Sequence, residues 1–333
     1  MAIQHTGKDL ATVTERTARA LMPYSGKGDK KFADHIAVET MRAALNDLDY
    51  RFHVVLGEGA KDDAPMLYTG EMLGARAGDE SVPIIDLVVD PLECTTNFAR
   101  GLPDSMSVLL AVPDGELQLV PGSYMQQLLV PQAVAHLLGK EITLDTPVVD
   151  VLSMVADGLG LSIDDLCVVV QDRPRHAGLI AELRAHGAGV SLIESGSISA
   201  AYEVISGPSR RLQMLWGIFG APEALIIAFM ANHAGCGFLG RMAPHDVESE
   251  TETRDLGLEG RVLHGRELVR SGGVLVMSGI HGSSWLPGVE CRRQHGRNDY
   301  NVHTLFWSDA GLEILEHHNG ELVRSHTPAA NQD

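Results

Sequence analysis

Short apolar runs alternate with amphipathic stretches in the first part of the chain. Apolar residues recur at helical spacing over residues 10–22 and 34–48, which predicts two amphipathic helices. Residues 52–56, 84–89 and 107–112 are short apolar runs containing β-branched side chains, so they predict strands. The N-terminal part is therefore expected to mix helices with a β-sheet.

The second half follows a strand–helix–strand rhythm. Residues 167–170, 174–186 and 189–193 predict a βαβ unit, whose strands should pair in parallel through a right-handed crossover. No GxGxxG motif accompanies it, so a dinucleotide-binding fold is not supported. A second such unit follows, with its strand, helix and strand expected at residues 212–217, 222–233 and 236–239.

Composition narrows the class of protein. The 333 residues include 26 basic and 44 acidic side chains, a formal net charge of −18, which argues against nucleic acid or an anionic membrane as the main partner. The N-terminus lacks an apolar signal-peptide core, and the longest apolar run, residues 224–231, is too short to span a bilayer. We therefore expect a cytoplasmic protein. Four cysteines without a CxxC pair predict neither a zinc site nor a disulfide framework.

Polar residues gather at the end of the strand predicted over residues 84–89. Asp90 follows this apolar run directly, where an acid is costly unless something pairs with it. Pro91 should end the strand, because proline has no N–H to give to the ladder. Thr95 and Thr96 can offer hydroxyl and N–H groups to a phosphate if a helix begins beside them.

Further acids occupy turns and expected helix starts. Carboxylates without histidine or cysteine spacing suit hard cations such as Mg²⁺ or Mn²⁺, which can orient a water for attack on phosphorus. A plainer alternative is that each acid caps a helix or lies on the surface, and both interpretations stay open on spacing alone. The acids concerned are Asp29, Asp34, Glu58, Asp62, Asp63, Asp90, Glu93 and Glu223.

Longer motifs carry a resemblance to a known family. They are GKGDKKFADHIAVETMR, VVLGEGAKDDAPMLYTGE, VVDPLECTT, YMQQLLV, RPRHAGLIAEL, GIFGAPEA and VMSGIHG. With these motifs, in this order, the chain resembles the class II (GlpX-type) fructose-1,6-bisphosphatases of the lithium-sensitive sugar and inositol phosphatase superfamily. The resemblance implies a layered α-β-α-β-α sandwich with two lobes. Residues 1–150 would form the metal-binding catalytic lobe, and residues 151–333 a second lobe that contributes substrate contacts and Glu223.

The resemblance also implies an activity and residue roles. The reaction is hydrolysis of the 1-phosphate of fructose 1,6-bisphosphate, a gluconeogenic step, by a homo-oligomer (dimer or tetramer) that uses Mg²⁺ or Mn²⁺. Implied metal ligands are Asp34, Glu58, Asp90, Glu93 and Glu223. Asp62 and Thr95 are implied to orient and activate the attacking water. Implied substrate contacts are Glu93, Cys94, Thr95, Tyr124, Arg173, Arg175, His176, Ser195, Gly196, Ser197 and Gly220.

Two departures from the family pattern bear on the substrate. Cys94 stands where the family has glycine; a positive φ there would cost on the order of 1–2 kcal/mol, whereas with a negative φ the side chain would narrow the pocket. The family's DGD loop becomes Ser195-Gly196-Ser197, so two carboxylate acceptors are replaced by hydroxyls. A different sugar phosphate, from specialised metabolism, is therefore an alternative substrate.

Two other functions stay open. Cys94 and Arg100 have the C-x5-R spacing of cysteine-dependent phosphatases, in which a thiolate attacks phosphorus, although the loop lacks the glycine that such cradles use. The other is a catalytically silent homologue that acts as a binding or regulatory subunit. The retained set of acids argues against this second alternative.

Overall fold

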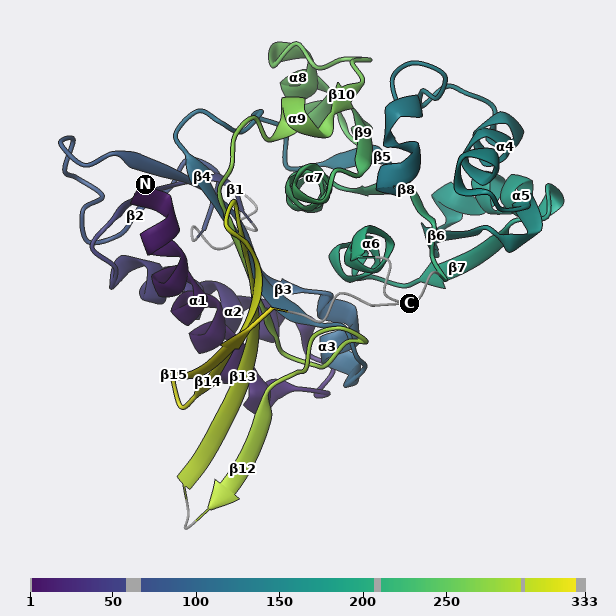
Figure 1. Cartoon of the computed structure of the whole chain (residues 1–333). Helices are drawn as coiled ribbons and strands as arrows, with labels where there is room; N and C mark the ends of the chain where they lie inside the picture. The colour runs from purple at the N-terminus through teal and green to yellow at the C-terminus, as the bar shows by residue number, and fades with distance from the viewer. Residues whose placement is uncertain (1, 58–66, 207–210, 295–296, 328–333) are drawn as a thin grey trace. The chain divides into compact units, whose positions relative to one another are not determined.

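The computed structural model describes residues 2–57, 67–206, 211–294 and 297–327 (Figure 1). The chain forms two compact units: the first combines residues 1–117 with 271–333, and the second comprises residues 118–270. Each unit has helices packed on a sheet that contains both parallel and antiparallel strand pairs. The mixed α/β class predicted from the sequence is therefore confirmed.

Among the described residues, nine strands form the sheet of the first unit in the order β15-β14-β13-β11-β4-β3-β1-β2, with β12 paired to β13. Strands β1 and β3 are parallel, and the other pairs are antiparallel. The bounds are β1 Arg51–Leu56, β2 Met72–Leu73, β3 Ile84–Glu93, β4 Met106–Pro113, β11 Val274–Gly279, β12 Glu290–Gln294, β13 Arg297–Ser308, β14 Gly311–His318 and β15 Glu321–His326.

Helices α1 (Ala2–Leu21) and α2 (Lys30–Asn46) pack on this sheet, burying Leu10 and Met41 against Leu87 of β3. Helix α1 begins well before the predicted start because its first residues are largely polar and give no apolar period. Gly7 allows close packing there, since a Cβ at this position would collide with the Phe306 ring of β13. Two short helices complete the unit, a 3₁₀ turn at Met22–Tyr24 and α3 at Thr95–Arg100.

The sheet of the second unit has the strand order β10-β9-β5-β8-β6-β7. Strand β6 is parallel to β7 and β8, whereas β5 is antiparallel to both of its neighbours, β8 and β9. The bounds are β5 Tyr124–Val130, β6 Cys167–Gln171, β7 Gly189–Ile193, β8 Met214–Gly220, β9 Gly237–Met242 and β10 Leu263–His264.

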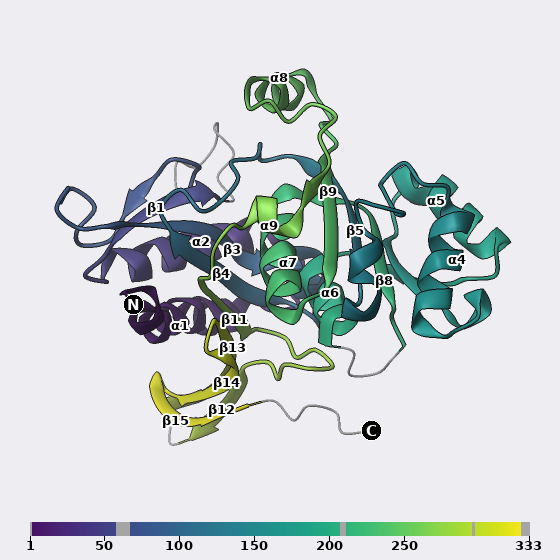
Figure 2. The same ribbon diagram turned by 45° about the horizontal axis from the view of Figure 1, so that its top comes forward.

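Helices lie on both faces of this second sheet: α4 and α5 on one face, α6 and α7 on the other (Figure 2). Among the described helices of the chain, none is both long and apolar enough to cross a membrane. The bounds are α4 Val148–Leu159, α5 Ala177–Ala185, α6 Ser197–Ser206, α7 Ala221–Ala234, α8 Val247–Asp255 and α9 Gly265–Leu268, with 3₁₀ turns at Gln132–Leu137, Ile163–Asp165 and Pro174–His176.

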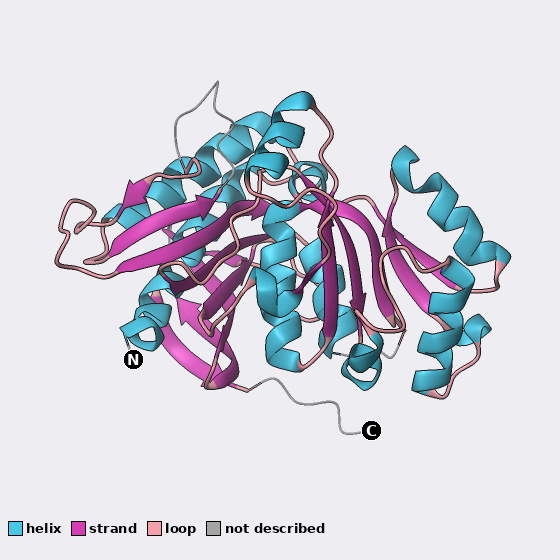
Figure 3. Cartoon of the chain, turned by 90° about the horizontal axis from the view of Figure 1, so that it is seen from above, coloured by secondary structure: helices cyan, strands magenta, loops and turns pink. Residues whose placement is uncertain are grey.

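The predicted strand–helix–strand units are both present in the second sheet (Figure 3). In the first of these units, β6 precedes α5 in the sequence and β7 follows it, and the two strands pair directly in parallel, as expected. In the second, β8 and β9 flank α7 but do not pair, because β5 lies between them. Strand β5 comes from a distant part of the sequence, so local periodicity gave no sign of its position.

One local expectation differs from the structure. Pro91 does not end its strand: β3 continues to Glu93, and its register with β4 shifts between Asp90 and Glu93. At such an irregularity Pro91 is not paired with β4, so its missing N–H costs the sheet no hydrogen bond. The division into lobes at residue 150 stays a prediction; in the structure β11 returns from the C-terminal part of the chain to pair with β4 of the first unit.

Candidate functional site

Two buried carboxylates lie at the end of β3. The side chains of Asp90 and Glu93 belong to residues that are only 4% and 5% exposed, and each offers an oxygen within 4.8 Å of the other's. Asp90 Oδ1 accepts a hydrogen bond from the Leu92 N–H at 3.1 Å, and Glu93 Oε2 accepts one from the Cys94 N–H at 3.0 Å. Two like charges this close and this far from water favour a bound cation.

Asp86, four residues earlier on β3, shows what a purely structural acid looks like in this strand. Its Oδ1 lies 2.9 Å from His53 Nδ1, and its Oδ2 accepts the Gly115 N–H at 2.8 Å. It is as buried as Asp90, and both of its carboxylate oxygens have partners from neighbouring segments. Asp86 is therefore assigned a structural role in this strand.

Asp34 and Thr95 are brought together by the packing of α2 beside α3. Burial raises the pKa of Asp34 to about 6, while a hydrogen bond with Thr95 and the charge of Lys30 act in the opposite direction. The Thr95 hydroxyl also lies 3.0 Å from the Leu92 carbonyl oxygen. A carboxylate whose charged form is disfavoured by burial gains most from a cation. Asp29, by contrast, is the N-cap of α2 and accepts the Phe32 N–H at 3.1 Å.

Cys94 adopts a left-handed backbone conformation, with φ 67° and ψ 41°, just before α3. The first alternative raised by the sequence therefore holds, and the cysteine occupies a position that favours glycine. Its N–H donates to the Glu93 carboxylate and is not open to a phosphate. Cys94 and Arg100 also lie at opposite ends of α3. This geometry does not favour a cysteine-dependent phosphatase.

The second unit holds another group of predicted residues around the ends of β5 and β8, where Tyr124 and Gly220 pair in register. The guanidinium carbon of Arg175 lies 4.6 Å from the centroid of the Tyr124 ring. Arg175 also donates from Nε and Nη2 to the Ile218 carbonyl oxygen, at 3.2 and 2.9 Å. Three of the implied substrate contacts therefore lie close together in this unit.

His176 is buried beneath this group and has a structural position. Its Nδ1 lies 2.7 Å from the Gln171 carbonyl oxygen, and its Nε2 accepts the Ile218 N–H at 2.8 Å. Since Nε2 accepts, Nδ1 carries the proton and the ring is neutral. Burial lowers the pKa of His176, which agrees with the neutral form. His176 thus ties the main chain of Gln171 to that of Ile218, whose carbonyl oxygen Arg175 contacts.

The remaining predicted residues fall in three places. Arg173 donates to the Glu194 carbonyl oxygen at 2.8 Å and so ties down the loop of Ser195, Gly196 and Ser197, in which Gly196 has φ +88° and Ser197 begins α6. Glu223 lies in the first turn of α7, and a Cβ on Gly220 would overlap its carboxylate. Glu58 and Asp62 lie outside the described residues.

Sequence reasoning missed the role of Glu71, the buried acid that ends the second long motif. Glu71 accepts hydrogen bonds from Arg42 Nε and from the Leu67 N–H, both at 2.6 Å, so it ties the segment at Leu67 to α2. Its motif was recognised but its role was not, because Arg42 lies on α2 and only the folded chain brings the two together.

These features define an α/β protein whose first unit holds buried carboxylates of the kind that suit a hard cation, and whose second unit holds an arginine of the kind that suits phosphate. The chain belongs to the family of bacterial, glpX-encoded fructose-1,6-bisphosphatases, whose family model matches residues 4–310. The resemblance found in the sequence is thereby confirmed.

Two cyanobacterial relatives illustrate the similarity, and both are named D-fructose 1,6-bisphosphatase class 2/sedoheptulose 1,7-bisphosphatase. The protein of Synechococcus sp. (strain JA-3-3Ab) is 40% identical over 256 residues, which cover 74% of this chain and 72% of the relative. That of Synechocystis sp. is 38% identical over 245 residues, covering 71% and 69%.

Proposed function

We propose that this protein is a metal-dependent phosphatase acting on a sugar bisphosphate, with the 1-phosphate of fructose 1,6-bisphosphate as the first candidate. Membership of the family supports the reaction class, and the names of the relatives support the substrate class. The observation that carries the proposal is the pair of buried carboxylates, Asp90 and Glu93, with Thr95 two residues after Glu93.

Oxygen ligands on several segments fit Mg²⁺ or Mn²⁺. We assign Asp34, Asp90 and Glu93 to this role, together with Glu223 of the second unit and Glu58 outside the described residues. When bound, the cation supplies positive charge that orients water and neutralises a leaving oxygen. The raised pKa of Asp34 and the burial of Asp90 and Glu93 support this assignment, because each carboxylate needs a positive partner to stay ionised.

The chain's own residues then orient the reactants. We assign Asp62 to accept a proton from the attacking water, whose oxygen forms the new bond to phosphorus as the bond to the sugar oxygen breaks. Thr95 would help to orient this water, since its hydroxyl is already placed by Asp34 and the Leu92 carbonyl oxygen. Arg175, with a planar guanidinium resting on Tyr124, suits a phosphate of the substrate.

The choice of sugar is the open part of the proposal. Where the family pattern has two acids, Ser195 and Ser197 offer hydroxyls, which are weaker acceptors for sugar hydroxyl groups. The relatives' names include sedoheptulose 1,7-bisphosphate, so a longer sugar is a specific alternative. A different sugar phosphate of specialised metabolism fits the same change of residues.

The test is phosphate release from a panel of sugar mono- and bisphosphates, with Mn²⁺, Mg²⁺ or EDTA. We expect release from at least one bisphosphate that EDTA abolishes, and the preferred member identifies the sugar. Cys94→Ser should remain active; loss of activity in this variant, together with release that ignores EDTA, would support the cysteine mechanism. No release and no metal binding in calorimetry would favour a silent binding subunit.

We further propose that the protein works as a homo-oligomer, a dimer or tetramer, in the cytoplasm, and that its reaction serves gluconeogenesis. This part of the proposal rests on the family resemblance alone. Light scattering on the protein as it elutes from a size-exclusion column would determine the oligomeric state. A monomer at micromolar concentration would contradict the proposed homo-oligomer.

A further inference from the structure

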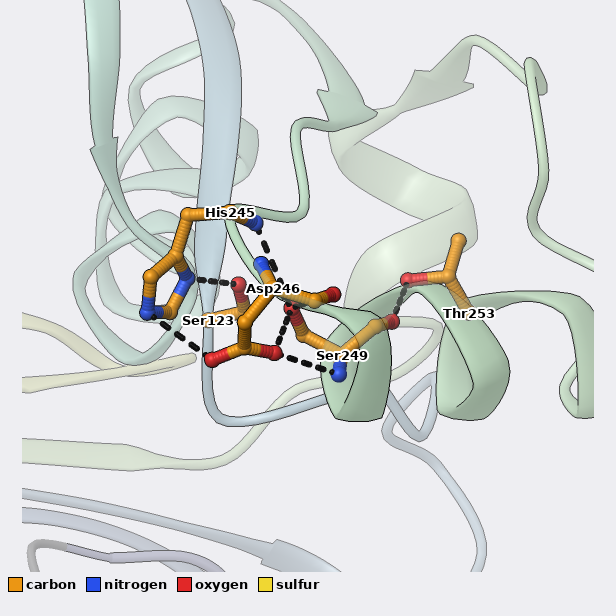
Figure 4. A network of polar contacts seen from close by, with 5 residues as sticks. All are labelled: Ser123, His245, Asp246, Ser249 and Thr253. Atoms are coloured by element: carbon orange, nitrogen blue, oxygen red, sulfur yellow. Dashed lines mark hydrogen bonds and ion pairs between the residues drawn. The ribbon is translucent and has the colours of Figure 1, made fainter.

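A polar network at the start of α8 involves residues outside the proposed catalytic set (Figure 4). Asp246 is the N-cap of α8, and its Oδ1 accepts the Ser249 N–H at 2.8 Å and the Ser249 hydroxyl at 2.7 Å. In return, Ser249 Oγ accepts the N–H groups of His245 and Asp246 at 3.2 and 3.3 Å. Because this reciprocal cap satisfies donors on both sides of the helix start, it fixes the main chain at His245.

The imidazole of His245 has a polar partner at each nitrogen. Nδ1 lies 3.0 Å from Ser123 Oγ, and Nε2 lies 3.2 Å from Asp246 Oδ2 (Figure 4). Hydrogen bonds from Ser249, that of its main-chain N–H first, lower the pKa of Asp246, so the carboxylate stays charged and can only accept. Nε2–H therefore donates to Asp246, and in the neutral ring Nδ1 accepts the Ser123 hydroxyl proton.

This Ser-His-Asp arrangement is not a nucleophilic triad. Ser123 is only 7% exposed, so a substrate does not reach its hydroxyl. Its carbonyl oxygen accepts the Ala221 N–H at 2.8 Å, which ties it to the first residue of α7. The carboxylate of Asp246 is also occupied by the helix cap. The network therefore orients the ring of His245.

The oriented ring contacts the residue that follows Ser123. His245 and Tyr124 meet edge to face, with ring centroids 5.1 Å apart and an interplanar angle of 74°. Tyr124 in turn carries the Arg175 guanidinium, 4.6 Å from its centroid. All of these residues belong to the second unit. A chain of contacts therefore runs from the cap of α8 through His245 and Tyr124 to Arg175.

We propose that His245 is a positioning residue that holds the Tyr124 ring, and through it Arg175, in the arrangement that receives a phosphate of the substrate. The inference rests on the proposed function, in which Tyr124 and Arg175 contact the substrate. A side chain that is ordered before binding loses less conformational freedom when the substrate arrives. His245 does not touch the reacting atoms, so its effect falls on KM and leaves kcat unchanged.

The test compares steady-state phosphate release from fructose 1,6-bisphosphate, with Mn²⁺, in a set of variants. We expect His245→Ala to raise KM roughly 3- to 10-fold, the effect of leaving one side chain to be ordered on binding, with kcat within about twofold. His245→Phe keeps an aromatic edge against Tyr124 and should recover part of the loss. His186→Ala is the matched control, because His186 is an exposed histidine at the end of α5, and it should match wild type.

Inorganic phosphate as a competitive inhibitor gives a second readout, and its inhibition constant should rise in parallel with KM in His245→Ala. An unchanged KM in His245→Ala, or a fall in kcat alone, overturns the inference and leaves the proposed function standing. If His245→Ala does not fold, as judged by circular dichroism, Ser123→Ala decides, since it frees only one end of the ring and should raise KM by a smaller factor. No release by the wild-type protein from any sugar phosphate overturns both proposals.

Discussion

The left-handed conformation of Cys94 gives a direct energetic test at the scale of single residues. With φ 67°, any side chain costs about 1–2 kcal/mol there, whereas replacing a residue by glycine usually costs about 0.4–1 kcal/mol through the unfolded state. Cys94→Gly and Cys94→Ala both remove the thiol. We therefore expect the glycine variant to have the higher free energy of unfolding, by about 0.5–1 kcal/mol, in urea titrations. Equal stability, or a more stable alanine variant, would contradict the strain.

Asp34 gives a second residue-scale prediction, on pH in the presence of EDTA. Its pKa is raised from 3.8 to about 6 by burial, so the folded protein binds the proton more tightly than the unfolded chain does. The contribution of this group to stability is therefore greatest below pH 3.8 and is lost as the pH rises through about 6.

Asp34→Asn removes this effect while keeping the shape of the side chain. In urea titrations we expect the variant to be more stable than the wild type at pH 7.5 and similar to it at pH 4. Asp29→Asn is the control, because asparagine caps a helix as well as aspartate does, and it should stay close to wild type. A wild-type protein that is as stable as Asp34→Asn at pH 7.5 would contradict the raised pKa.

Sequence reasoning singled out Asp90 as a costly acid directly after an apolar run, but it had nothing to say about Asp86 on the same strand. The partners of Asp86 are His53 and the Gly115 N–H, which lie on other segments. Whether a buried acid is structural or available to a cation depends on such long-range contacts. Local spacing therefore finds candidate ligands but does not separate them from satisfied carboxylates.

At the scale of elements, periodicity predicted the helices α2 and α7 and the strands β1, β3, β4, β6 and β7 close to their observed positions. It did not predict that β5 lies between β8 and β9, or that β11 to β15 join the first sheet. Pairing partners far apart in sequence leave no local signal, because the same apolar alternation suits any neighbour. The sequence therefore predicts elements better than it predicts their order in the sheets.

The His176 ring joins the strands β6 and β8, and its removal should weaken their connection. His176→Ala leaves the Gln171 carbonyl and the Ile218 N–H without their hydrogen bonds to the ring, so we expect a loss of about 2 kcal/mol in the free energy of unfolding.

The same residue predicts a pH dependence. Since burial lowers the pKa of His176 below 6.5, the unfolded chain binds the proton more tightly than the folded protein does. The wild type should therefore lose stability as the pH falls below 6.5, and this share of the loss should be absent from His176→Ala.

Urea titrations at pH 5.5 and 7.5 measure both effects. His186→Ala, at the opposite end of α5 and exposed, should resemble the wild type at each pH. The interpretation fails if His176→Ala is as stable as the wild type at pH 7.5, because the ring would then contribute no net hydrogen bonding.

At the scale of the whole molecule, a net charge of −18 opposes the approach of an anionic sugar phosphate. In the proposed function Arg175 would supply only part of the positive charge that a phosphate needs, and Asp90 and Glu93 add further negative charge. A bound divalent cation reverses the sign of the local field. The proposed metal would thus offset the repulsion that the acidic composition creates.

Metal binding should stabilise the whole molecule, because a ligand that binds only the folded form raises the free energy of unfolding by mass action. With free Mn²⁺ at about 100 times its dissociation constant, the increase over EDTA should be about 2.7 kcal/mol, seen as a higher midpoint in urea. Asp90→Asn should lose most of this increase and most of the turnover while keeping the fold. Asp86→Asn, on the same buried strand, should keep the increase, because His53 and the Gly115 N–H already occupy its carboxylate. An undiminished Mn²⁺ effect in Asp90→Asn would place the ion elsewhere and remove the central support for the proposed function.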